Sequence, residues 1–146
     1  MESVRRAILP PMNTLPSALQ AELGRLLGDA LRTDPSERIA YAFDNSRRQS
    51  LPDAVALPTT REQVVALVRA CRAARVPVIA RGRGTNTTGA AVPVAGGVVV
   101  SFERMNRILD IRPGDRCAGG EPGVVNGAVQ SALKPHGLFW PPDPTS

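Results

Sequence analysis

Apolar residues recur along the chain with two different periods, and these periods predict helices alternating with short strands. A first helix is predicted from about Ser17 to Leu31, with Thr14 or Ser17 as its N-cap. Its apolar stripe consists of Leu19, Leu23, Leu26, Leu27 and Leu31. The following segment, residues 33–52, is polar and is predicted to be irregular.

From Ala54 onward, short apolar runs predict strands at residues 54–57, 78–80 and 97–102. Between the first two, residues 60–63 (TREQ) have the pattern of a capping box, which predicts a helix to about Arg75 that ends before Pro77. Strand, helix and strand in this order predict parallel pairing with a right-handed crossover. Ligands of such sheets bind outside the carboxyl ends of the strands.

The last third of the chain predicts smaller elements. A strand at residues 108–111 is followed by a turn at 112–115 and by a weaker strand at 116–121, which Gly119 and Gly120 disfavour. A helix is then predicted from Val124 to about Pro135, with Gly137 as its C-cap residue.

A glycine-rich loop leaves the carboxyl end of the strand at residues 78–80. Its glycines permit positive φ and can direct backbone amides toward the oxygens of a phosphate. It is not a Rossmann fingerprint, because four residues and not two precede the third glycine. It is not a Walker A loop either, because two alanines replace the Lys and the Ser or Thr. A surface turn without a ligand stays open as the alternative. The loop consists of Arg81, Gly82, Arg83, Gly84, Thr85, Asn86, Thr87, Thr88 and Gly89.

Composition narrows the class of protein only modestly. The 146 residues carry a net charge of +5, but the arginines are scattered, so nucleic acid is not expected as a partner. Cys71 and Cys117 form no metal or redox motif, and Cys71 is expected in the core. No apolar stretch reaches the roughly 20 residues of a membrane helix. We expect a cytoplasmic protein, with peripheral binding to the inner face of the membrane as an alternative.

Three ordered motifs resemble the flavin domain of the FAD-linked oxidases, which vanillyl-alcohol oxidase, D-lactate dehydrogenase and the large glycolate oxidase subunit share. The glycine loop with residues 90–111 is similar to their pyrophosphate-binding region. Residues 44–58 resemble the lead-in to their first strand, and residues 121–144 their helix and flavin-edge segment. One departure is Gly119-Gly120, where the family has bulky β-branched residues.

The resemblance implies an α+β fold. An N-terminal extension with one helix (residues 1–40) comes first. Residues 41–146 then form the N-terminal part of a vanillyl-alcohol oxidase-type FAD-binding domain, with its first β-α-β subdomain and the start of the second. The resemblance also implies that residues 81–89 wrap the FAD pyrophosphate and that Pro142 and Asp143 line the flavin. Arg83 as a solvent-facing charge and Asp143 as the cap of a following turn stay open as alternatives. Covalent members carry a His where this chain has Thr85, so FAD is expected to be held non-covalently. Trp140 is expected in the core rather than over the flavin, and His136 at a helix end.

By the same resemblance, the whole protein is expected to oxidise a 2-hydroxy acid of the glycolate or D-lactate type to a 2-oxo acid and to pass electrons to an unidentified acceptor. The residues that bind and deprotonate the acid are expected beyond Ser146, so no catalytic or metal-binding residue is assigned here. We expect the chain by itself to be inactive, to bind FAD weakly and to self-associate through an exposed sheet edge. A small non-catalytic nucleotide- or partner-binding protein is the alternative.

Overall fold

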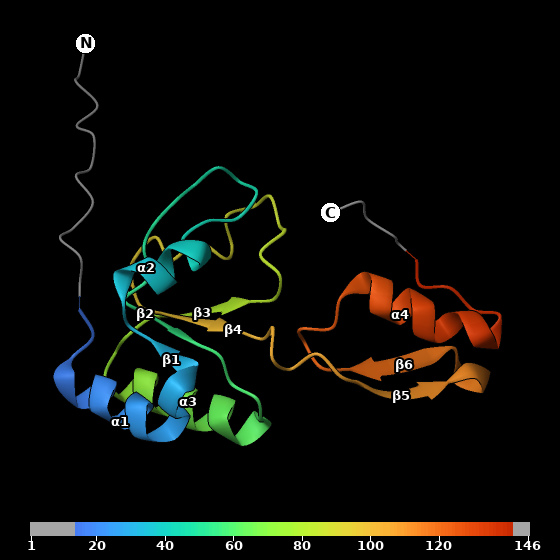
Figure 1. Ribbon diagram of the computed structural model, residues 1–146, viewed down its shortest axis with the longest axis horizontal. Coiled ribbons are helices and arrows are strands. Elements are labelled where there is room, and N and C mark those ends of the chain that lie inside the picture. The colour runs from blue at the N-terminus through green and yellow to red at the C-terminus, as the bar shows by residue number, and fades with distance from the viewer. Residues whose placement is uncertain (1–13, 142–146) are drawn as a thin grey trace, which may run out of the picture.

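The computed structural model describes residues 14–141 of the chain. Figure 1 shows a four-stranded sheet with two helices, α1 and α3, together on one of its faces, followed by a two-stranded sheet that packs with the last helix. The principal elements are α1 (Ser17–Leu27), β1 (Leu31–Arg32), α2 (Pro35–Arg38), β2 (Ala54–Ala56), α3 (Arg61–Ala73), β3 (Val78–Arg81), β4 (Val98–Ser101), β5 (Ile108–Arg112), β6 (Cys117–Gly120) and α4 (Asn126–Leu133).

The four-stranded sheet has the order β1-β2-β4-β3. The chain passes from β2 through α3 to β3, and β4 then returns between them, parallel to both. Val99 therefore pairs with Val55 on one side and with Ile79 on the other. This arrangement confirms the predicted parallel β-α-β unit, and it brings the carboxyl ends of three strands to one edge of the sheet.

The core lies between this sheet and its two helices. Residues 54–56 and 98–100 are essentially inaccessible to solvent, as expected for central parallel strands that are covered on both faces. Leu67 and Cys71 of α3 and Leu23 of α1 are equally buried against them. The prediction that Cys71 is a core residue is confirmed, and burial raises the pKa of its thiol.

The first helix is shorter than predicted. It ends at Leu27, because Gly28 takes a left-handed φ of 53°, and Leu31 belongs to β1, which pairs antiparallel with β2. Neither Thr14 nor Ser17 caps it, since the N-cap residue is Pro16 and no side chain bonds the free amides. The segment 33–52 is also more regular than predicted, because Asp34 caps the short helix α2 and a 3-10 turn follows at residues 39–41.

The predicted capping box at α3 is confirmed with one difference. The Thr60 hydroxyl accepts a hydrogen bond from the Gln63 amide at 3.2 Å, but the Gln63 side chain accepts from the amide of Thr59, at 2.8 Å, and not from that of Thr60. The helix ends at Ala73, and Arg75 reverses the chain with a φ of 55° before Pro77.

The predicted weak strand is present as β6, antiparallel to β5. A β carbon at Gly119 would lie 2.1 Å from Oδ1 of Asp110, so the carboxylate on β5 occupies the space that a bulkier residue on β6 would need. The α4 helix is shorter than predicted; a 3-10 turn at residues 134–136 follows it, and Gly137 ends that turn with a φ of 66°. Across the described residues, no helix is long and apolar enough to cross a bilayer.

Candidate functional site

The glycine-rich loop begins where β3 ends, at the edge of the sheet where the parallel strands β2, β3 and β4 have their carboxyl ends (Figure 1). Arg81 is the last residue of β3 and pairs with Ser101, the last residue of β4. This is the position at which open parallel sheets bind their ligands. The loop therefore starts directly from the sheet, and the chain returns through residues 90–97 to the start of β4.

The loop presents a series of free backbone donors. Within residues 14–141, no group accepts a hydrogen bond from the six consecutive amides of Gly82 to Thr87, whereas the Thr88 amide donates to Oδ1 of Asn86 at 3.2 Å. Gly84 has a φ of 71°, the left-handed conformation that a concave run of amides requires. Six free amides at this edge of the sheet can bind an anion such as a phosphate.

A distant segment, residues 41–46, holds the loop from the outside. The Asn45 amide donates to the carbonyl of Asn86 at 3.0 Å, and the Asn45 side chain donates to the carbonyl of Thr85 at 3.1 Å. The sequence predicts residues 44–46 only as the start of the lead-in to the first strand, and residues 41–43 only as part of an irregular segment. Helical or strand periodicity carries no signal for such a contact, because it depends on two irregular segments meeting in space.

Arg81 differs from the other loop residues in its surroundings. Its side chain is buried, and Nη1 donates to the carbonyl oxygen of Phe43 at 2.7 Å. The guanidinium lies over the ring of Tyr41, with Cζ 5.7 Å from the ring centroid. Burial lowers the pKa of Arg81, while the neighbouring Tyr41 and Asp44 act in the opposite direction.

Two other cations, one within the loop and one beside it, are exposed. Arg83 has no ion-pair partner among the described residues. Arg48 was not selected from the sequence, yet its Cδ would lie 3.3 Å from a β carbon at Gly89, so it stands beside the far end of the loop. Asp44 is the acidic residue of this region; hydrogen bonds from Ser46 hold the pKa of its carboxyl below the usual range.

The third sequence motif also reaches the loop. The carbonyl oxygen of Pro122 lies 3.8 Å from the position that a β carbon of Gly82 would take. Gly123 donates its amide to the carbonyl of Met105 at 2.8 Å, which anchors this turn to the connection after β4. The structure therefore brings parts of all three motifs together, although Asn45 is 41 residues from Asn86 and Gly82 is 40 residues from Pro122 along the chain.

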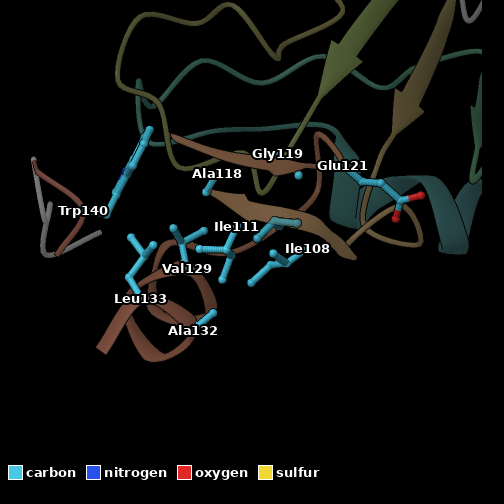
Figure 2. Close-up of a pocket in the computed structure, with 11 residues that line it drawn as sticks. Ile108, Ile111, Ala118, Gly119, Glu121, Val129, Ala132, Leu133 and Trp140 are labelled. Atoms are coloured by element: carbon cyan, nitrogen blue, oxygen red, sulfur yellow. The ribbon is translucent and has the colours of Figure 1, made fainter. Parts of the chain in front are cut away.

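The remaining candidate residues lie elsewhere. Pro142 and Asp143 fall outside the described residues. His136 is the last residue of the 3-10 turn after α4, as predicted. Trp140 is 45% exposed, so the prediction that it fills the core is wrong. It stands at one edge of an apolar pocket of about 170 Å³ between α4 and the β5–β6 pair, and Glu121 stands at the other end (Figure 2).

Trp140 is held at this position by main-chain bonds, because the side chain of Gln130 on α4 bonds both its amide and its carbonyl group. No group of three or more His, Cys, Asp or Glu residues that would suit a metal ion occurs in the described part of the chain.

A family model described as an FAD binding domain matches residues 52–146, which include the glycine loop and the Pro122 turn. The chain belongs to this FAD-binding domain family. FAD is the family's cofactor, and the vanillyl-alcohol oxidase type of fold that the sequence resemblance implied is confirmed.

Several curated proteins are similar to the chain. It is 43% identical to glycolate oxidase subunit GlcD of Escherichia coli (strain K12) over 119 residues, which are 81% of this chain and 24% of that protein. It is 38% identical to D-2-hydroxyglutarate dehydrogenase of Stutzerimonas stutzeri (strain A1501) over 76% of this chain and 24% of that protein. The chain thus spans about a quarter of the length of these relatives.

Solved structures show the same fold. An alkyldihydroxyacetonephosphate synthase superposes with a TM-score of 0.79 at 25% identity, over 98% of this chain and 31% of that one. A substrate-bound p-cresol methylhydroxylase superposes with a TM-score of 0.69 at 29% identity, over 83% and 24% respectively.

The geometry of the loop fits the pyrophosphate of FAD. A pyrophosphate offers several anionic oxygens, and the loop offers six free amides with Arg83 and Arg48 beside it. At Gly84 the space where a β carbon would stand is already filled by the guanidinium of Arg81, so any other residue would distort this surface.

Proposed function

We propose that this chain forms the pyrophosphate-binding part of the FAD site of an oxidoreductase that converts a 2-hydroxy acid, of the glycolate or D-lactate type, to a 2-oxo acid. The observation that carries the proposal is the run of six free amides at the carboxyl end of β3. The names of the relatives, glycolate oxidase subunit GlcD and D-2-hydroxyglutarate dehydrogenase, support the substrate class.

In this proposal the role of each residue follows from its position in the loop. The amides of Gly82 to Thr87 bind the phosphate oxygens, and the side chain of Arg83 adds a charge-assisted bond. Thr88 and Gly89 continue the wall of the site toward Arg48. When bound, FAD would supply the redox chemistry, as the group that accepts a hydride from the hydroxy acid. Pro142 and Asp143 are retained as residues that line the flavin.

Non-covalent binding of FAD is part of the proposal. Thr85 stands in the exposed loop, and its side chain has no nitrogen with which to bond the flavin. Denaturing the whole enzyme in acid should therefore release all of its flavin into solution. Flavin that stays with the polypeptide would contradict this part of the proposal.

A titration monitored by nuclear magnetic resonance tests the site directly, because it detects even millimolar affinity. We expect FAD to shift the amide signals of residues 82–89 in the 146-residue chain, and riboflavin, which has no pyrophosphate, to leave them in place. Equal shifts with both compounds would contradict the pyrophosphate assignment. No shift at millimolar FAD would contradict the site itself.

Self-association through a sheet edge stays a prediction. The outer strands of the larger sheet are β1 and β3, and the β5–β6 sheet has only two strands, so free edges are available. Sedimentation velocity at several protein concentrations is the measurement, and a constant monomer mass would contradict the prediction.

A further inference from the structure

Arg81 is the one charged residue of the glycine loop whose head group is enclosed by this chain's own groups. Only 8% of the residue is exposed, and Nη1 bonds the carbonyl of Phe43 while the guanidinium covers the ring of Tyr41. Nη1 is therefore occupied by a carbonyl of this chain, and the Tyr41 ring covers one face of the guanidinium. Buried cations that lose their partners are costly, so the observed arrangement is the favoured one.

The guanidinium also supports the turn of the loop. A β carbon at Gly84 would lie 2.2 Å from Nη2 and 2.3 Å from Cζ of Arg81, so the main chain of Gly84 rests directly against the guanidinium. The side chain of Arg81, the first residue of the loop, therefore packs against the turn at Gly84 and sets the position of that residue. The free amides on either side of Gly84 depend on this position.

Tyr41, whose ring lies beneath the Arg81 guanidinium, is linked by hydrogen bonds to the end of the sheet. The Tyr41 hydroxyl donates to Oε1 of Glu103 at 3.0 Å, and the Ser101 hydroxyl lies 3.4 Å from the other carboxylate oxygen of Glu103. Ser101 is buried and is the β4 partner of Arg81. Tyr41 is thus linked through Glu103 to Ser101 at the end of β4. The end of β4 pairs in turn with Arg81, whose guanidinium lies over Tyr41.

We propose that Arg81 is a positioning residue that shapes the glycine loop from the inside, and that it does not bind the phosphate; the exposed Arg83 carries that charge. The proposal rests on the proposed function for the identity of the anion. It assigns different roles to two arginines that stand two residues apart in the same loop and that the sequence resemblance places together around the pyrophosphate.

Backbone relaxation of the ¹⁵N-labelled chain tests this role without any ligand. In the native chain and in Arg83→Gln, we expect order parameters of residues 82–89 near those of a rigid backbone, ~0.85. In Arg81→Gln they should fall toward ~0.6, the value of a flexible segment, while those of β2, α3 and β4 stay unchanged. Loop order that is the same in Arg81→Gln as in the native chain would overturn the proposal.

Because Arg81 is buried, its replacement can unfold the chain. The variant Tyr41→Leu then tests the positioning role of Arg81, because it removes the ring beneath the guanidinium and leaves the β3 sequence intact. We expect the same loss of order confined to residues 82–89. A folded Tyr41→Leu chain whose loop keeps its native order would overturn the proposal.

A titration with FAD separates this proposal from the proposed function. We expect FAD to shift the side-chain Nε signal of Arg83 and not that of Arg81, and Arg83→Gln to weaken FAD binding roughly tenfold, the loss expected for one charge-assisted hydrogen bond. A direct shift of the Arg81 Nε signal equal to that of Arg83 would overturn the positioning role. If FAD shifts no signal at all, the proposed function fails, while the relaxation results on the loop still decide the role of Arg81.

Discussion

Gly97 lies so close to Pro77 that a β carbon at Gly97 would stand 2.3 Å from the Pro77 carbonyl oxygen and 2.8 Å from its Cβ. Gly97 also has a φ of 94°, which other residues rarely adopt. The two residues immediately precede β4 and β3, so this contact sets how closely the two strands approach at the start of their pairing.

We therefore expect Gly97→Ala to lower the free energy of unfolding by about 1–3 kcal/mol, the usual cost of overpacking against atoms that cannot move aside. Urea unfolding followed by circular dichroism measures this loss. Gly24→Ala in the middle of α1 is the matched control, because nothing lies within 4 Å of the new methyl group. It should raise the stability by about 0.5–1 kcal/mol; equal effects of the two changes would contradict the prediction.

Gly84→Val should abolish the binding of FAD. The valine would have to adopt a left-handed backbone, at about 1–2 kcal/mol, and its β carbon would occupy the place of the Arg81 guanidinium. Titration with FAD, monitored on the signals of residues 82–89, measures the effect. Gly114→Val is the control, since that glycine has no atom within 4 Å of the added β carbon. Unchanged affinity in Gly84→Val would show that the loop is not the pyrophosphate site.

Glu121 should make the stability of the chain depend on pH. Hydrogen bonds from the Arg107 side chain and amide, at 2.7 and 2.8 Å, hold the pKa of Glu121 below its usual 4.5. Because the ionised form is favoured in the folded state, its contribution is present above about pH 4.5 and is lost as the pH falls through the folded pKa.

The measurement is urea unfolding of the native chain and of Glu121→Gln between neutral pH and pH 3. The native chain should be more stable at neutral pH, and the difference between the two chains should shrink as the solution becomes acidic. Comparing the two chains cancels the contributions of Asp34 and Asp44, whose pKa values are also lowered. A difference that is independent of pH would contradict the role of the ion pair.

Trp140 is the single tryptophan of the chain and reports on the segment that follows α4. Gln130→Leu removes both bonds to its main chain, each worth about 0.5–1.5 kcal/mol. We expect stronger quenching of the Trp140 fluorescence by acrylamide and emission at longer wavelength. Gln20→Leu, on the exposed side of α1, is the control and should change neither property. Identical quenching in both variants would show that Gln130 does not hold this segment.

Much of the fold could be read from local pattern. The strands β2, β3 and β4 are short runs of Val, Ile and Ala between turn residues, and α3 carries both an N-terminal capping pattern and an apolar stripe. These features are local, so neighbouring residues suffice to define them. The end of α1 could not be predicted in this way. The apolar stripe continues to Leu31, but in the structure Leu31 belongs to β1 and pairs with Ala56 of β2.

The sequence by itself determined α3, the three central strands with their parallel direction, and the place of the glycine loop, because periodicity and turn chemistry act over a few residues. Only the tertiary structure decided which of the loop's two arginines is buried, that Asn45 holds the loop, and that Asp110 fills the space above Gly119. Each of these depends on two segments that meet across the fold, and the contact energy between them is not encoded in the spacing of either one.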